Sequence, residues 1–379
     1  MTDLRELIQS ALPEALGGLI ATAVALMCGW LWKLVRRRAR GAETPSTRRD
    51  DGERRRGRAA LVVGSIALLG FALLSEFVGP ALSGRLVSGR SLKVISARRW
   101  VTYDPQGNWE WSQGIHFDLS SSTSEVDLTR RELGWIRRAG FDGIITFTSR
   151  GRFAAIPRLA KEEGLAVIMG VWEPRDAQEV MAAIAQRDYV DAYCVGHNGL
   201  GDSRYSIEEL TEAVGYIRFH SGRPVSTTEK LGFYLSHKEL LSLGDWVFPD
   251  AHVSVKEEAG VYRADAARDT RQVIEWSKLI AAQPEREGKP VLLKMVAYPM
   301  SGISNASLEE QASFFVSLFE SRRDVMPYLP SDVSVSVHSA FDMPWKTKWP
   351  FYEWEPYAGL LNDDGTPRPA AQEIVKRLP

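Results

Sequence analysis

The chain has 379 residues, of which 44% are hydrophobic and 25% are charged, the proportions of an ordinary globular protein. The net charge of −1 is unevenly placed: residues 36–58 hold ten Arg against four acidic residues, which leaves about −7 for the rest. This acidic remainder argues against nucleic acid as the main partner. The two cysteines, Cys28 and Cys194, lie far apart in the chain, so we expect neither a disulfide framework nor a cysteine metal site.

Two uncharged runs lie near the N-terminus, at residues 15–32 and 59–75. Each is about long enough to span a hydrocarbon core of roughly 30 Å. We therefore expect a membrane anchor over residues 1–92, with transmembrane helices at about 15–35 and 59–79. A pair of buried core helices fits poorly with so many arginines between them. A cleaved signal peptide fits poorly because the basic block follows the first apolar run.

The Arg-rich loop 36–58 sets the expected orientation. The positive-inside rule places this loop in the cytoplasm, where it can contact anionic headgroups of the lipid bilayer. Both chain ends then face the other side. We therefore expect a two-pass protein of the cell membrane with its C-terminal domain on the extracytoplasmic side.

From about residue 92, short β-rich runs alternate with amphipathic stretches, which is typical of βαβ units around a parallel sheet. Eight such units in about 285 residues match the size of a TIM barrel. The predicted fold class is therefore α/β, a (β/α)8 TIM barrel over residues 93–379 preceded by two transmembrane helices. A doubly wound sheet is the main alternative, but no Gly-rich nucleotide loop follows the first run. The predicted strands are 93–101, 143–147, 166–171, 192–195, 224–228, 246–249, 291–296 and 333–337, and the predicted helices are 124–139, 155–163, 176–186, 206–220, 237–243, 264–283 and 307–321.

Aromatic and polar residues follow the predicted strands, and barrel active sites form at the C-terminal ends of strands. Carbohydrate sites have this composition, because rings stack on the apolar face of a sugar while polar groups bind its hydroxyls. Aromatic residues also fill ordinary cores, so each ring alone is more often structural. The candidate substrate-binding residues are Tyr103, Trp172, Glu173, His197, His252, Tyr298, Trp345 and Lys346.

Five ordered segments carry a family resemblance. They are Tyr-Cys-Val-Gly-His-Asn-Gly-Leu at 193–200, the stretch 206–229, Asp-Trp-Val-Phe-Pro-Asp-Ala-His at 245–252, Val-Leu-Leu-Lys-Met-Val-Ala-Tyr-Pro-Met at 291–300, and Ala-Phe-Asp-Met-Pro-Trp-Lys at 340–346 with Glu355-Pro356 beyond it. Together they resemble glycoside hydrolase family 17, the β-1,3-glucanase family, especially its bacterial members. The resemblance runs from about 99 to 377 and implies a barrel that takes β-glucan and needs no cofactor.

The departures from this family concern its catalytic residues. The family is retaining, with an acid/base and a nucleophile whose carboxyl groups lie about 5 Å apart. The acid/base Glu of the family aligns with Asn198, and the nucleophile Glu aligns with Met295. A third position, which is polar in the family, holds Met343 here. Asn cannot protonate a leaving group, and Met cannot attack or stabilise an oxocarbenium ion. The catalytic residues are therefore unknown, with Glu229 and Asp342 as displaced candidates.

Three functions follow from these observations. The leading one is a membrane-anchored, catalytically impaired barrel that binds β-glucan or a related envelope polysaccharide. The first alternative is an active retaining β-glucan hydrolase or transglycosylase that uses Glu229 and Asp342. The second is a protein-binding scaffold with a vestigial cleft. We expect no metal, because His197 and His252 lie on non-adjacent strands and no ligand triplet emerges.

We predict that a protease added to intact cells digests the C-terminal domain, because the arginines of loop 36–58 hold that loop in the cytoplasm. Immunoblotting against the domain measures the digestion. Digestion only after the membrane is opened, in cells without an outer barrier, would contradict this topology.

Overall fold

The computed structural model of the protein describes residues 92, 95–106, 123–252, 257–258, 261–320, 329–348 and 353–377. The two apolar runs and the Arg-rich loop lie outside these ranges. Among the helices within them, none is both long and apolar enough to cross a bilayer. The membrane anchor therefore stays a prediction from the sequence.

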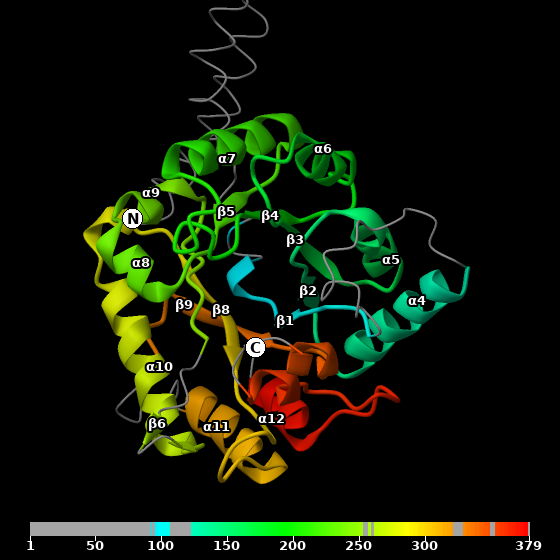
Figure 1. The fold of residues 1–379 in the computed structure, drawn as a ribbon, viewed down its shortest axis with the longest axis vertical. Helices are drawn as coiled ribbons and strands as arrows, with labels where there is room; N and C mark the ends of the chain where they lie inside the picture. Colours follow the sequence, from blue (N-terminus) through cyan, green and yellow to red (C-terminus); the bar gives the residue numbers. More distant parts are fainter. Residues whose placement is uncertain are drawn as a thin grey trace, which may run out of the picture. The chain divides into compact units, whose positions relative to one another are not determined.

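Seven parallel strands form one curled sheet, in the order β5-β4-β3-β2-β1-β9-β8. Their residues are buried along their whole length, as expected for a parallel sheet that is covered on both faces. Helices surround the strands (Figure 1). The strands are β1 (Trp100–Thr102), β2 (Gly143–Ile145), β3 (Ala166–Val171), β4 (Ala192–Val195), β5 (Val225–Thr227), β8 (Val291–Ala297) and β9 (Val333–His338).

An extended segment between β5 and β8 closes the sheet into a barrel. Val247 pairs with Val291 of β8, and Asp250 pairs with both Lys294 of β8 and Lys230, which follows β5. Backbone hydrogen bonds of 2.8 to 3.2 Å join the segment to these two neighbours. The segment thus occupies the place of an eighth strand, and the architecture fits the predicted (β/α)8 barrel.

Most of the predicted helices are present, with shifts of a few residues at their ends. Local capping explains the boundaries of α7. The Ser206 side chain accepts from the Glu209 N–H while Glu209 accepts from the Ser206 N–H, and Gly222 ends the helix with φ of 65°. The helices in the described ranges are α4 (Thr123–Arg138), α5 (Ile156–Glu162), α6 (Ala177–Ala185), α7 (Ile207–Ser221), α8 (Leu231–Ser236), α9 (Glu239–Leu243), α10 (Ala266–Ala281), α11 (Leu308–Glu320) and α12 (Pro369–Arg377).

The structure differs from the predicted elements in three places. The first strand begins at Trp100 and not at residue 93, since residues 95–96 are helical. The segment predicted as a strand at 246–249 makes isolated bridges, because Pro249 has no N–H for a continuous ladder. Helices α8 and α12 and the small antiparallel hairpin of β6 (Glu257–Glu258) and β7 (Val261–Tyr262) are absent from the predicted elements.

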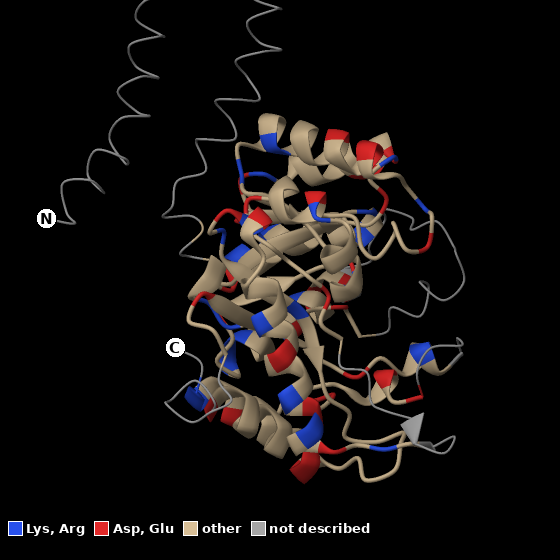
Figure 2. Cartoon of the chain, turned by 90° about the vertical axis from the view of Figure 1, so that its left-hand side faces the viewer, with Lys and Arg blue, Asp and Glu red and all other residues tan. Residues whose placement is uncertain are grey.

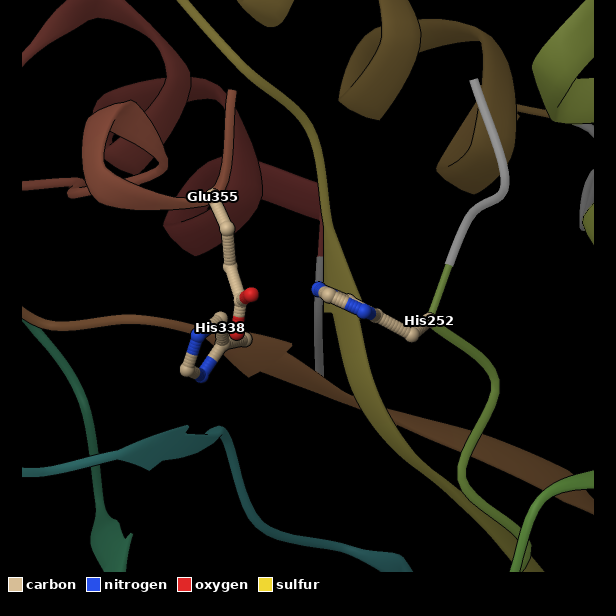
Figure 3. Close-up of side chains that lie close together, drawn as sticks. All are labelled: His252, His338 and Glu355. Atoms are coloured by element: carbon tan, nitrogen blue, oxygen red, sulfur yellow. The ribbon is translucent and has the colours of Figure 1, made fainter. Parts of the chain in front are cut away.

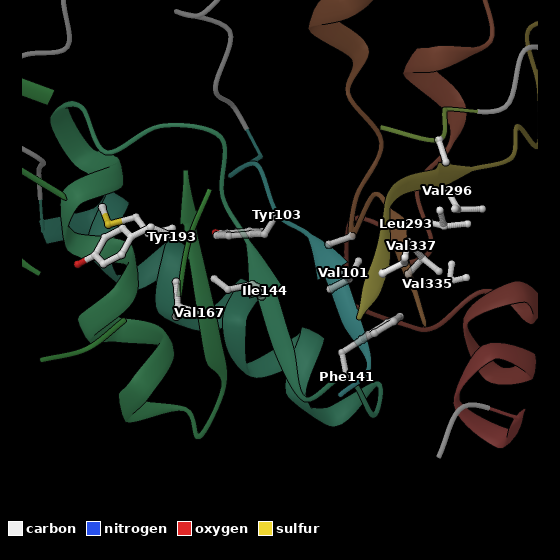
Figure 4. Packing of buried hydrophobic residues seen from close by; sticks show 14 of the residues in the cluster. Val101, Tyr103, Phe141, Ile144, Val167, Tyr193, Leu293, Val296, Val335 and Val337 are labelled. Atoms are coloured by element: carbon white, nitrogen blue, oxygen red, sulfur yellow. The ribbon is translucent and has the colours of Figure 1, made fainter. Parts of the chain in front are cut away.

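Side chains alternate between two layers along each strand, as the strand period requires. One cluster fills the barrel interior. The other lies between the strands and the surrounding helices, and Figure 4 shows part of it. Charged residues of both signs are interspersed over the surface that Figure 2 presents. Interior residues include Trp100, Ile145, Ile168, Cys194 and Phe248, and outer-layer residues include Val101, Ile144, Val167, Tyr193 and Leu293.

Tyr103 belongs to the outer layer, which corrects its assignment to the substrate site. Its ring is fully buried, and its hydroxyl donates to Glu132 Oε2 of α4 at 2.5 Å. The sequence could not reveal this, because a shift of one residue in register moves a side chain to the other face. Burial raises the pKa of the Glu132 carboxyl to about 7, although the Tyr103 hydroxyl stabilises its charge.

We expect Glu132→Gln to change the pH dependence of stability. The raised pKa means that the folded state keeps a proton between about pH 4.5 and 7 that the unfolded state has released. The contribution of Glu132 to stability is therefore largest below pH 4.5 and falls by up to about 3 kcal/mol as the pH rises to about 7. The variant lacks this loss, so its free energy of unfolding rises relative to that of wild type over the same pH range. Urea unfolding of both proteins from pH 4.5 to 8 measures the difference, and two parallel stability profiles would disprove the assignment.

Candidate functional site

The candidate site lies at the C-terminal ends of the barrel strands, an end that we call the mouth. Buried Glu179 of α6 ties together the loops that follow β2 and β3. Its carboxylate accepts from the Thr148 hydroxyl at 2.5 Å and from the N–H groups of Trp172 and Glu173 at 2.8 and 3.0 Å. Arg150 Nε lies 3.0 Å from its Oε2 and balances the charge. No strand-end pattern in the sequence points to Glu179, because this residue comes from a helix.

Trp172 and His197, both predicted site residues, lie together at the mouth. Their rings stack with centroids 5.1 Å apart and planes 26° apart. The Arg204 guanidinium lies 4.5 Å from the Trp172 centroid and donates to the Trp172 carbonyl at 3.1 Å. These contacts cover part of the indole, so a ligand must use the part that remains exposed.

Lys294 of β8 is a buried amine in the barrel interior, and it is not among the site residues predicted from the sequence. It is 1% exposed, and its Nζ lies 2.8 Å from His197 Nδ1. The rings of Phe147 and Phe248 lie 5.3 and 5.7 Å from its Nζ. Burial lowers the pKa of Lys294, against the pull of acidic neighbours that include Asp250. Burial, reinforced by Lys294, lowers the pKa of His197 well below its usual range, so His197 is the neutral acceptor.

Asn198 and Met295, the two residues that the sequence resemblance aligns with catalytic glutamates, both have positive φ. Asn198 has φ of 54°, and its Nδ2 donates to Asp250 Oδ2 at 2.6 Å. Asp250 also accepts from the His252 N–H at 3.1 Å. Met295 has φ of 59° and is 4% exposed, at an irregularity in the pairing of β8 with β9. Both residues adopt backbone conformations that Asn tolerates and Met rarely adopts.

Glu229, one of the displaced candidates, is fully buried. Its Oε1 accepts from the Leu200 N–H at 3.1 Å and from the Tyr205 hydroxyl at 2.9 Å. Burial raises the pKa of this carboxyl, and the hydrogen bonds from Leu200 and Tyr205 only partly oppose the rise. These contacts hold the loop that follows β4, which includes Asn198.

Asp342, the other displaced candidate, forms a bidentate ion pair. Arg368 donates to its two carboxylate oxygens at 3.0 and 2.8 Å, and the Gly359 N–H donates to Oδ1 at 2.9 Å. The side chain of Arg368 is only 7% exposed. This arrangement anchors the C-terminal segment to the loop after β9.

The remaining predicted site residues divide into two groups. Tyr298 does not reach the mouth: it is fully buried, stacks on Phe314, and donates to Asp269 Oδ2 at 3.2 Å. Its assignment as a sugar-binding residue is corrected for the same reason as that of Tyr103, since its side chain faces the helices. Glu173 and Trp345 are partly exposed, and the Glu173 carboxylate accepts from Arg175 Nε at 3.1 Å.

A hollow of about 430 Å³ lies between the loop that follows β4 and helix α8. None of the candidate substrate-binding residues lines it. Its lining includes Leu200 and Tyr205, which Glu229 holds in place. The hollow therefore adjoins the mouth's supporting loop and is not assigned to the site.

His252, His338 and Glu355 come together at the mouth, although they lie far apart in the sequence (Figure 3). One potential ligand atom of each lies within 4.8 Å of the others. Glu355 begins the short 3-10 helix Glu355–Tyr357 and accepts a hydrogen bond from Lys346 Nζ. Burial opposes ionisation of Glu355, but the charges of Lys346 and His252 outweigh it and lower the pKa of the carboxyl. No such triplet emerges from the sequence, where His197 and His252 are the candidates and neither His338 nor Glu355 stands out.

The fold is that of a (β/α)8 barrel, and solved structures of glycoside hydrolases have a similar fold. GH5_18 from Bifidobacterium longum subsp. longum aligns with a TM-score of 0.53 and 14% identity, over 74% of this chain and 78% of that chain. A single-residue variant of GH5_18 from Streptomyces cattleya, in complex with Manb1-4GlcNAc, aligns with a TM-score of 0.51 and 18% identity, over 75% and 80%.

These identities show the fold alone. No protein-family model matches the sequence, and no curated protein matches it. The structure fits the predicted (β/α)8 barrel, and the two neighbours named above are GH5_18 enzymes, so the resemblance to family 17 specifically is not shown.

We predict that Asp342→Asn lowers the free energy of unfolding by about 3 kcal/mol, because it leaves the buried Arg368 guanidinium without its counter-charge. Urea unfolding measures the loss. The matched control is Asp363→Asn, an exposed carboxylate whose loss we expect to change stability by less than about 0.5 kcal/mol. Equal stability of the two variants would show that the Asp342 carboxylate is free for another role.

Proposed function

We propose that the protein is a glycoside-hydrolase-like barrel that binds a β-linked glycan at its mouth and does not hydrolyse it. We further propose, from the sequence alone, that its N-terminal helices anchor it in the cell membrane with the barrel on the extracytoplasmic side. The similarity in fold to glycoside hydrolases supports a carbohydrate-related scaffold.

The buried amine of Lys294 is the observation that carries this proposal. Glycoside hydrolysis passes through an oxocarbenium-like transition state, which carries positive charge and is stabilised by a nearby carboxylate. Here the residue next to Met295 places an amine in the barrel interior, 2.8 Å from His197. An amine supplies no negative charge to a positive transition state, and its protonated form opposes one, since electrostatic interactions are strong where water is excluded.

The carboxylates near the mouth are already engaged with other groups. Asp250 accepts from the Asn198 side chain, and Asp342 forms the ion pair with Arg368. Glu229 is buried against Tyr205 and the loop after β4. These contacts favour supporting roles for Glu229 and Asp342 over the acid and nucleophile of a displaced catalytic pair. The active-enzyme alternative therefore lacks a free pair among the described residues.

Glycan binding needs none of the lost carboxylates. Trp172 and Trp345 are partly exposed, and aromatic rings at such positions stack on the apolar face of a sugar. Glu173 is also partly exposed and can accept hydrogen bonds from hydroxyls, whereas the Lys346 ammonium is engaged by Glu355. A solved structure with a similar fold holds Manb1-4GlcNAc, which makes a β-linked saccharide a reasonable class of ligand for this barrel.

We expect calorimetry with the full-length protein to detect a β-linked oligosaccharide at micromolar to millimolar Kd, roughly −4 to −8 kcal/mol. The panel contains laminari-oligosaccharides and the disaccharide Manβ1-4GlcNAc. Trp172→Ala and Trp345→Ala each remove a stacking surface and should weaken binding at least tenfold. Chromatography of the same samples should show no released sugar.

Tyr216→Ala is the matched control, because Tyr216 is an exposed aromatic residue on α7 that none of the mouth contacts involves. Its binding should equal that of wild type. Rapid hydrolysis by the unmodified protein would overturn the proposal and restore Glu229 and Asp342 as the catalytic candidates. No binding of any glycan would leave the protein-scaffold alternative.

A further inference from the structure

The cluster of His252, His338 and Glu355 has the composition of a metal site. Two imidazoles and one carboxylate are a common ligand set for zinc and for other divalent transition metals. The three come from separate elements, namely the segment that closes the barrel, the last residue of β9 and the 3-10 helix Glu355–Tyr357. Barrel closure and the C-terminal loop therefore create the cluster jointly.

The arrangement around His338 shows that the site is built and not accidental. His338 is fully buried, and its Nδ1 lies 2.5 Å from the Thr102 hydroxyl on β1. The second ring nitrogen, Nε2, is buried and has no hydrogen-bond partner among the described residues. Metal-binding histidines use this arrangement, because a partner on one nitrogen fixes the ring and leaves the other to bind the ion.

Glu355 supplies the one negative charge of the cluster, and Lys346 balances it. The Glu355 carboxylate is 6% exposed and accepts a hydrogen bond from the Lys346 ammonium. Lys346 thus provides, from outside the triplet, the positive charge that a buried carboxylate requires. A divalent ion would provide the same charge and would compete with Lys346 for Glu355.

We infer that His252, His338 and Glu355 form a binding site for a divalent transition-metal ion, of which Zn²⁺ is the best chemical match. Zinc lies about 2.0–2.2 Å from such ligands, so the three ligand atoms have to approach one another by about 1 Å. Three protein ligands leave one coordination position open at the mouth. This inference is independent of glycan binding.

Isothermal titration of the full-length, untagged protein with ZnCl₂ tests the site, with metal content measured after desalting. We expect one Zn²⁺ per chain, and a tetrahedral Co²⁺ spectrum when CoCl₂ replaces zinc. His338→Gln and Glu355→Gln should each weaken binding at least tenfold. Lys346→Met should strengthen it at least tenfold, because the competing ammonium is gone.

The control is His220→Gln, since His220 is an exposed histidine on α7 that could bind metal adventitiously. We expect this variant to bind as wild type does. A gain of Zn²⁺ affinity in Lys346→Met cannot arise from misfolding. The test therefore stays decisive even if His338→Gln and Glu355→Gln are unstable. Absence of stoichiometric Zn²⁺ in both wild type and Lys346→Met, or unchanged binding in His338→Gln, would overturn the inference.

Discussion

The arrangement of the mouth depends on the way the barrel closes. The segment that contains Val247 and Asp250 joins β5 to β8 through a few isolated pairs, since Pro249 interrupts a regular ladder. This closure carries Asp250 against Asn198 and places His252 near the end of β9. Because all the strands of a parallel barrel end on the same rim, the closing segment decides which side chains meet there.

The second constraint is the placement of buried charge. Lys294 lies within the barrel with two aromatic rings and a neutral His197 around its ammonium. An isolated buried charge is costly, so these contacts and the acidic residues nearby are required to keep it there. A glycoside hydrolase needs the opposite, a negative charge near the sugar ring, which is why the shared fold does not imply shared catalysis.

The rest of the mouth is held by carboxylates that act as anchors. Glu179 fixes the loops after β2 and β3, and Glu229 fixes the loop after β4. Asp342 fixes the C-terminal segment through Arg368. Each of these acidic groups accepts several hydrogen bonds, which rigidifies the partly exposed Trp172 and the surrounding loops. A rigid mouth of this kind can bind a ligand without a pair of catalytic carboxylates.

The sequence by itself determined the order of strands and helices, because hydrophobic periodicity and capping residues such as Ser206 are local properties. Through the family resemblance it also located Asn198 and Met295. Only the tertiary structure decided which way the side chains face: Tyr103 and Tyr298 point to the helices, whereas Lys294 points inward. It alone brought His338 and Glu355 to His252. Register and long-range closure are set by packing between distant segments, and no local pattern in the sequence records them.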